Sequence, residues 1–328
     1  MHRVKCFECG GVVEDPYVDT CPRCGGLLIV EVDMDEASGL RPYDLRKRPL
    51  GVWRYAPFLP VDASKAVTLQ EGGTPLYDCS SLRAKLGVKK VHVKYEGANP
   101  TGSFKDRGMT VGVTRAVELG CRTVGCASTG NTSASLSAYA AKAGLTCIVL
   151  LPSGKVAAGK LAQAMFYGAK VVMVDGNFDD ALRVTRELAR EGVLYLLNSI
   201  NPFRPEGQKT VAFEIMDQLD LDLPDRVILP VGNAGNISAV HKAFQEWKAL
   251  GWIDRIPMLT GIQAAGSAPI VRALATRESR NISIRRDGRH SCSLSAVCKL
   301  RAIASRPCRR SRVMTRAIGS MNQPWRST

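Results

Sequence analysis

A lysine in an unusual setting lies in the segment N-P-T-G-S-F-K-D-R-G, which spans residues 99–108. The helical spacing after it predicts that Lys105 lies in the first turn of a helix. The positive end of that helix and the neighbouring Arg107 both disfavour a second positive charge, so we expect the Lys105 amine to have a lowered pKa. Such an amine can form a Schiff base with an aldehyde cofactor. The alternative is a solvated lysine paired with Asp106.

Two glycine-containing loops are suited to binding anions. In A-S-T-G-N-T-S, residues 127–133, hydroxyls, a glycine and an amide open a helix whose N–H groups could hold a carboxylate. In P-V-G-N-A-G-N-I-S, residues 230–238, Gly232 and Gly235 allow the backbone to approach a phosphate closely at a helix start. Each loop taken alone is also compatible with an ordinary helix cap or turn.

A fourth loop, N-S-I-N-P-F-R-P-E-G-Q-K-T, spans residues 198–210 and carries Arg204 between two prolines. The planar guanidinium presents a fork of donors that suits phosphate. The alternative is a surface ion pair with Glu206.

Four cysteines near the N-terminus form a separate pattern. Two C-x2-C-G-G knuckles carry the cysteines in pairs, Cys6 with Cys9 and Cys21 with Cys24. Together they offer four thiolates, the number that a tetrahedral zinc ion accepts. The alternatives are disulfides, free thiols or a site that has lost its metal. A closed site of four sulfurs leaves no position for a substrate, so its expected role is structural.

Between residues 91 and 262, short apolar segments alternate with segments of helical spacing. The predicted strands cover 91–96, 123–127, 146–151, 170–174, 193–197, 227–231 and 258–262; the predicted helices cover 104–119, 132–143, 178–190, 203–219 and 237–248. Buried strands that alternate with helices predict a parallel α/β sheet, whose ligands bind beyond the carboxyl ends of the strands. Residues 36–90 are predicted to be irregular.

Taken together, the four loops resemble those of the pyridoxal-phosphate enzymes of fold type II, most closely the threonine synthase family, over residues 71–274. The cysteine knuckles are similar to an N-terminal extension of some archaeal-type members. The resemblance implies an α/β fold with two parallel-sheet subdomains and a small zinc-ribbon-like module. The implied domains are the zinc-ribbon-like module (1–35), the fold type II catalytic domain, incomplete at its C-terminal end (36–274), and an atypical Arg-rich tail (275–328).

The resemblance also implies a reaction and the residues that perform it. The reaction is the pyridoxal-phosphate-dependent conversion of O-phospho-L-homoserine and water to L-threonine and phosphate. Lys105 matches the Schiff-base lysine of the family, and Asn131 matches the amide that contacts the pyridine 3-oxygen. The loop that holds the cofactor's phosphate is matched by Gly232, Asn233, Ala234, Gly235 and Asn236. The substrate's carboxylate would be held by Ser128 and Thr129, and its phosphate by Ser199 and Arg204.

Three other functions stay open. A threonine dehydratase-like lyase would share Lys105 and the glycine loop, but its substrate has no phosphate for Arg204. The chain could also be an inactive, truncated homologue, or a zinc-ribbon nucleic-acid binder with a degenerate enzyme body. Phosphate release from O-phosphohomoserine, compared with keto-acid formation from threonine, distinguishes a synthase from a dehydratase. A test of salt-dependent DNA binding identifies a nucleic-acid binder.

The formal net charge of +15 is concentrated at one end of the chain. Residues 275–328 hold 13 of the 45 Lys and Arg, 12 of them Arg, against Glu278 and Asp287 alone. The remainder of the chain is close to balanced, so a nucleic-acid partner is not indicated.

The cysteine count and the lack of long apolar segments limit where the protein is expected. The 11 cysteines are an odd number, which argues against a secreted scaffold held together by disulfides. No apolar segment reaches the roughly 20 residues of a membrane helix. We therefore expect a cytoplasmic protein with a small-molecule substrate, and a homodimer is one assembly that we consider.

The tail departs from the family pattern after residue 274. It shows no βα alternation and no evident partner for the pyridine nitrogen; Ser291, Ser293 and Ser295 are candidates by residue type only. The alternatives are a disordered Arg-rich tail and an arm that binds an acidic partner. We favour the hypothesis that a shifted reading frame in the source gene produced the tail, which the gene sequence tests.

Overall fold

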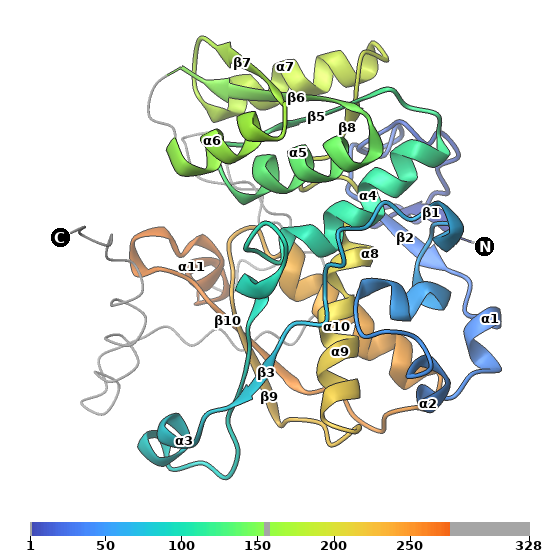
Figure 1. Ribbon diagram of the computed structural model, residues 1–328, viewed down its shortest axis with the longest axis vertical. Coiled ribbons are helices and arrows are strands. Elements are labelled where there is room, and N and C mark those ends of the chain that lie inside the picture. Colours follow the sequence, from blue (N-terminus) through green and yellow to red (C-terminus); the bar gives the residue numbers. More distant parts are fainter. Residues whose placement is uncertain (1, 154–157, 276–328) are drawn as a thin grey trace.

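A small N-terminal module and two α/β units make up the computed structural model, which describes residues 2–153 and 158–275 (Figure 1). In the module, β1 (His2–Cys6) pairs antiparallel with β2 (Leu28–Val32). The two cysteine knuckles lie between these strands, and a separate small core forms from Cys6, Val13, Cys21 and Leu28. So few apolar residues give little stabilisation on their own, which is why such modules usually need a metal or disulfides.

The first α/β unit contains the predicted parallel sheet. Its strands are β5 (Thr123–Ala127), β6 (Thr146–Pro152), β7 (Lys170–Val174) and β8 (Tyr195–Leu196), hydrogen-bonded in the order β7-β6-β5-β8. The connecting helices are α5 (Asn131–Ala143), α6 (Ala158–Phe166) and α7 (Phe178–Arg190). The Asn177 side chain caps α7 by accepting the N–H groups of Asp179 and Asp180. Helix α4 (Lys105–Glu118) lies between this unit and the second (Figure 1), where it contacts α5 of the first unit and the helix that carries Arg204 in the second.

The second unit is built around aromatic side chains. Its helices are α8 (Arg204–Gln208), α9 (Thr210–Gln218), α10 (Gly235–Ala249) and α11 (Pro269–Ala275). The rings of Phe213 and Trp247 stack with their centres 5.0 Å apart, and Tyr55 and Phe58 pack against them. The predicted helix over 203–219 is divided only at Lys209, which keeps helical backbone angles.

The described strands of the second unit form two pairs, and one of them is parallel, as the implied second parallel-sheet subdomain requires. In the described residues, β9 (Arg226–Pro230) and β10 (Met258–Ile262) form a parallel pair, whereas β3 (Leu76–Asp78) and β4 (His92–Lys94) form a separate antiparallel pair. Apolar side chains of β9 and β10 remain exposed, among them Ile228 and Met258. The α/β class is confirmed, but this second sheet is small and partly uncovered.

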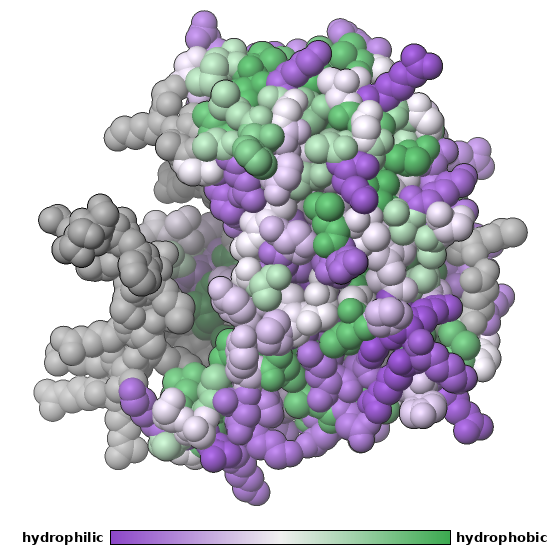
Figure 2. All heavy atoms as spheres, in the orientation of Figure 1, coloured by the Kyte–Doolittle hydropathy of each residue, from purple (hydrophilic) through white to green (hydrophobic). Residues whose placement is uncertain are grey.

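The segment expected to be irregular, 36–90, contains several short elements. They are α1 (Asp35–Ser38), α2 (Pro42–Leu45), α3 (Ser80–Leu86) and the 3-10 helices η1 (Val52–Phe58) and η2 (Ala63–Lys65); η3 (Glu96–Ala98) and η4 (Ala265–Ser267) occur further on. Hydrophilic side chains cover the surface around α1 and α2 (Figure 2). No described helix is long and apolar enough to cross a membrane. The predicted tail, apart from Ala275, lies outside the described residues.

Candidate active site

Lys105 is the first residue of α4, as predicted. Its backbone N–H donates to Ser103 Oγ at 3.3 Å. The next residue, Asp106, is buried and accepts hydrogen bonds from the Thr101 N–H at 2.7 Å and from Ser135 Oγ at 2.6 Å. These bonds attach the N-P-T-G-S turn and α5 to the start of α4. Asp106 therefore holds the loop in place, and the predicted alternative in which it pairs with Lys105 is wrong.

The Lys105 amine has the lowered pKa expected from the sequence, but for a different reason. Burial, aided by the positive charge of Arg204, lowers its pKa to about 7. The expected contribution of Arg107 is absent because Glu96 and Glu214 neutralise that guanidinium. The Lys105 Nζ lies 4.4 Å from the centre of the Phe104 ring. About half of these amines are neutral near pH 7, which is the form that attacks a carbonyl.

Arg204 is a cation buried in the part of the chain that the structure describes. The residue is 1% exposed, and its Nε, Nη1 and Nη2 atoms have no hydrogen-bond partner among the described residues. Burial lowers the pKa of its guanidinium to about 10. The predicted alternative, a surface ion pair with Glu206, is wrong, because Glu206 pairs instead with Lys209 and Lys242. An unpaired buried charge costs several kcal/mol, so this guanidinium is poised to receive an anion.

Glycines bring the Lys105 and Arg204 helices into direct contact. A Cβ at Gly207 of α8 would collide with the Arg107 carbonyl oxygen, and one at Gly108 of α4 would lie 2.8 Å from the Arg204 carbonyl oxygen. A Cβ at Gly112 would meet the Arg204 side chain at 3.3 Å. Only residues without a side chain permit so close a crossing. The positions of these glycines explain how two residues 99 apart in the chain come to share one site.

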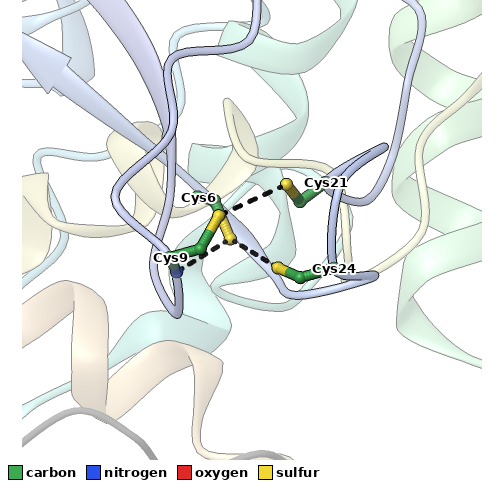
Figure 3. A group of neighbouring side chains, drawn as sticks. All are labelled: Cys6, Cys9, Cys21 and Cys24. Atoms are coloured by element: carbon green, nitrogen blue, oxygen red, sulfur yellow. Dashed lines mark hydrogen bonds between the residues drawn. The ribbon is translucent and has the colours of Figure 1, made fainter.

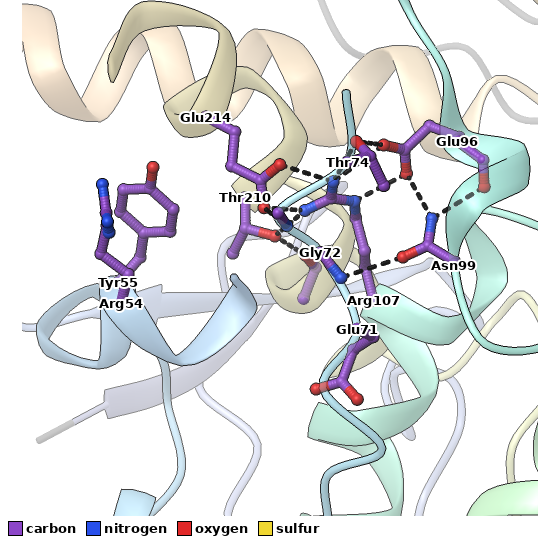
Figure 4. A network of polar contacts seen from close by, with 12 residues as sticks. Arg54, Tyr55, Glu71, Gly72, Thr74, Glu96, Asn99, Arg107, Thr210 and Glu214 are labelled. Atoms are coloured by element: carbon purple, nitrogen blue, oxygen red, sulfur yellow. Dashed lines mark hydrogen bonds and ion pairs between the residues drawn. The ribbon is translucent and has the colours of Figure 1, made fainter. Parts of the chain in front are cut away.

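A buried network of charges fixes the remainder of α4's first turn (Figure 4). The fully buried Arg107 donates to Glu214 at 2.6 and 2.8 Å and to Glu96 at 2.6 and 2.8 Å. Glu214 also accepts from Lys94 Nζ at 2.6 Å and from the Gly73 N–H at 2.8 Å. Although burial alone would lower the pKa of Arg107, Glu214 and Glu96 raise it above its usual value. The network joins α9, β4 and the E-G-G-T loop to α4, and sequence patterns gave no indication of it.

The loop between β5 and α5 carries the residues predicted to hold a carboxylate. Ser128 and Thr129 are partly exposed, and Ser128 Oγ accepts from the Gly130 N–H at 3.2 Å. Asn131 is exposed at the first position of α5. The exposed Ser199 follows β8, next to a buried residue that sequence reasoning missed. That residue, Asn198, forms two 2.9 Å hydrogen bonds with the backbone of Ala127 and so fixes the carboxyl end of β5.

The predicted phosphate loop, 232–236, connects β9 to α10. Gly232 and Asn233 are exposed, and Asn233 Oδ1 accepts from the Gly235 N–H at 3.2 Å. The left-handed backbone conformation falls on Ala234, with φ of 62°, and not on either glycine. The Asn236 Oδ1 is buried and has no hydrogen-bond partner among the described residues. The loop thus has a bent backbone and one buried acceptor that lacks a donor.

The four cysteines converge as the spacing predicts (Figure 3). Their sulfurs all lie within 4.8 Å of one another, with Cys6 and Cys24 Sγ 3.4 Å apart and Cys9 and Cys21 Sγ 3.7 Å apart. These separations are far longer than a disulfide bond and close to the roughly 3.8 Å edge of a tetrahedron with 2.3 Å Zn–S bonds. The Cys9 N–H points at Cys6 Sγ at 3.5 Å, as amides do around thiolates.

Comparison with known proteins identifies the family. A family model described as "Pyridoxal-phosphate dependent enzyme" matches residues 67–304. The threonine synthase of Methanocaldococcus jannaschii is 63% identical over 276 residues, which are 83% of this chain and 68% of that protein. The threonine synthase of Methanosarcina acetivorans is 58% identical over 275 residues, 84% of this chain and 67% of that protein.

The chain belongs to the threonine synthase family of pyridoxal-phosphate-dependent enzymes. It spans about two thirds of the length of these two relatives. Solved structures show the same fold at lower identity. The match to threonine deaminase isoform 2 from Solanum lycopersicum has a TM-score of 0.56 at 23% identity and covers 70% of this chain and 65% of that chain. The match to maize serine racemase has a TM-score of 0.54 at 24% identity and covers 62% of this chain and 60% of that chain.

Membership of the threonine synthase family agrees with what the structure places together. The structure brings Lys105 and Arg204 to one crossing of α4 and α8, and α10, the helix that follows the predicted phosphate loop, packs against α8. The residues that support this crossing, the glycines of α4 and α8 and the Arg107 network, are the ones that motif reasoning missed. The two prolines around Arg204 and the G-x-x-G spacing of Gly232 and Gly235 indicated the loops but not the residues that support them.

Proposed function

We propose that this chain converts O-phospho-L-homoserine and water into L-threonine and phosphate. The observation that carries the proposal is a pair of residues: Lys105, an amine with a pKa of about 7, and Arg204, a buried guanidinium that has no hydrogen-bond partner within residues 2–153 and 158–275. The first suits chemistry on an amino acid, and the second suits a phosphate. The similarity to curated threonine synthases supports the same substrate.

We propose that pyridoxal phosphate is attached at Lys105 Nζ. The loop of Gly232, Asn233, Ala234, Gly235 and Asn236 would hold its phosphate, and Asn131 would contact its 3-oxygen. Support for the fit comes from the lowered pKa of the Lys105 amine and from the position of the loop at the N-terminal end of α10, where backbone N–H groups are donors for an anion. When bound, the cofactor supplies an aldehyde that condenses with amino groups and a ring that withdraws electrons from the substrate's Cα.

The residues of the chain then bind the substrate and move its protons. Ser128 and Thr129 would hold the substrate carboxylate at the start of α5, and Ser199 would assist Arg204 at the phosphate. Lys105 Nζ would accept the Cα proton and pass it on, then accept a proton from Cβ, deliver one to Cγ, which becomes the methyl group, and finally return one to Cα; its pKa near 7 permits these transfers at neutral pH. The Arg204 cation would stabilise the phosphate as it leaves Cγ, and water would add its hydroxide at Cβ while its remaining proton goes to the released phosphate. The network around Arg107 keeps the amine in position throughout.

Two assays separate this reaction from its alternative. A threonine synthase releases inorganic phosphate from O-phosphohomoserine, whereas a dehydratase-like enzyme forms a keto acid from threonine. A dehydratase-like substrate has no phosphate and gives the buried Arg204 cation nothing to bind. The proposal predicts phosphate release that depends on Arg204, with no keto acid from threonine. Keto-acid formation that Arg204→Met leaves unchanged would contradict it.

We further propose that Cys6, Cys9, Cys21 and Cys24 bind one structural zinc ion. Their sulfur separations and the small core of the module support this assignment. We also propose a cytoplasmic location, which the free state of the described cysteines supports. A homodimer is supported by exposed apolar side chains on α6, where Phe166 is 86% exposed. Sedimentation of the purified chain tests the assembly.

A further inference from the structure

The N-terminal module contacts the segment that carries Arg204 from two directions. One contact is through rings: the His2 imidazole meets the Phe203 ring edge-on, with centres 5.4 Å apart. Phe203 is 2% exposed and shares a buried apolar cluster with Val30 of β2. The Arg115 guanidinium of α4 lies 5.0 Å from the centre of the same ring. Phe203 immediately precedes Arg204, so the module contacts the residue next to the one that we propose binds phosphate.

The second contact is a chain of charges. Lys242 Nζ on α10 donates to the Val30 carbonyl oxygen of β2 at 2.6 Å and forms a short ion pair with Glu206 Oε1. Glu206 is 2% exposed, and its other oxygen accepts from Lys209 Nζ at 2.7 Å. Lys209 also donates to Glu246 at 2.8 Å. Although burial alone would raise the pKa of Glu206, Lys209 and Lys242 hold it below its usual value, so the link is ionic at neutral pH.

The two contacts flank Arg204 on its short helix. Phe203 lies one residue before it and Glu206 two residues after it, and the guanidinium between them has no partner of its own among the described residues. No hydrogen bond from another described residue fixes the Arg204 guanidinium. Its position therefore depends on how its helix is held against α4 on one side and against β2 on the other.

We propose that Lys242 is a positioning residue for phosphate binding, because it ties the N-terminal module to the Arg204 helix through Glu206. The N-terminal module then contributes to substrate recognition. A displacement of β2 would lower the affinity of Arg204 for the substrate's phosphate. This inference rests on the proposed function, in which Arg204 holds that phosphate. It assigns no contact between Lys242 and the substrate.

The test measures the affinity for inorganic phosphate by titration calorimetry on the full chain saturated with pyridoxal phosphate, which fills the cofactor's own phosphate site. Lys242→Met is expected to raise the dissociation constant on the order of tenfold, since small misplacements of a binding group cost that much or more. Lys248→Met is the matched control, because Lys248 is exposed on the same helix. Lys242→Arg, which keeps the charge and the donors, is expected to restore most of the affinity.

Two further measurements make the result specific. The effect of Lys242→Met should persist at 0.5 M salt, because a positional effect is not screened, whereas long-range attraction of phosphate to Lys242 is. Far-ultraviolet circular dichroism verifies that each variant is folded, and Lys242→Gln replaces Lys242→Met if the latter unfolds. A dissociation constant equal to that of Lys248→Met, or an effect that salt removes, would overturn the proposal.

Arg204→Met separates this inference from the proposed function. If Arg204→Met leaves phosphate affinity unchanged, the assignment of the phosphate site to Arg204 fails, and the role of Lys242 fails with it. If Arg204→Met abolishes binding while Lys242→Met matches its control, the proposed function stands and the positioning role alone is refuted.

Discussion

Replacing Glu214 by glutamine tests the buried network that holds the start of α4. Glu214 is fully buried and accepts hydrogen bonds from Arg107, Lys94 and the Gly73 N–H. Despite burial, which opposes it, the two cations lower its pKa from 4.5 to about 2. A shift of that size corresponds to about 3 kcal/mol of folding free energy at neutral pH. This agrees with the roughly 3–5 kcal/mol lost when one partner of a buried ion pair is removed.

The sign of the shift sets the pH range of the effect. A carboxyl whose pKa is lower in the folded than in the unfolded chain stabilises the fold above pH 4.5, and this stabilisation is lost as the pH falls toward 2. Urea unfolding followed by circular dichroism should therefore show Glu214→Gln about 3 kcal/mol less stable than the parent chain at pH 7. The difference should shrink steadily below pH 4.5.

The matched control is Asp222→Asn, which removes one partner of an ion pair whose side chains are 68–69% exposed. Exposed pairs contribute little, so no resolvable change is expected. A Glu214→Gln variant as stable as the control, or a loss that is the same at pH 7 and pH 3, would refute the assignment of stability to this network.

Three further predictions follow from the site and the module. Lys105→Ala should abolish both turnover and the absorbance of lysine-bound pyridoxal phosphate; in the parent chain, the rate of cofactor attachment should rise with pH around a midpoint of about 7, because deprotonation frees the amine. Gly207→Ala should cost about 1–3 kcal/mol or more, measured by urea unfolding, since its Cβ would collide with the Arg107 carbonyl, whereas Gly159→Ala, in open space, should cost nothing. Metal analysis should find one zinc per chain that Cys21→Ser removes, with loss of thermal stability; full stability without metal would contradict the module's dependence on it.

Much of the fold followed from patterns within short segments. The predicted helix 178–190 and the strands 123–127, 170–174 and 258–262 coincide with α7, β5, β7 and β10, because apolar periodicity and caps are local signals. Strand ends elsewhere shifted by one or two residues. The predicted strand 91–96 contains β4, but its antiparallel pairing with β3 was not predicted, because β3 has only three residues and lies in the segment expected to be irregular.

The site was predictable in its loops and not in its supports. The family motifs indicated Lys105 and Arg204, but the lowered Lys105 pKa is caused by burial and by the charge of Arg204, and both depend on segments far away in the sequence. The roles of Gly207 and Glu214 depend on which backbone passes beside them, which no local pattern encodes. Ala234 shows the same limit: the left-handed turn falls on it, between glycines that would adopt it at less cost.

The most direct test of the account is to find where pyridoxal phosphate attaches. The purified chain is loaded with the cofactor, treated with borohydride to fix the bond to whichever amine holds it, digested and mapped by mass spectrometry. The account predicts a pyridoxyl group on the peptide that contains Lys105. A modified peptide elsewhere in the chain, or no modified peptide from folded protein, would contradict it.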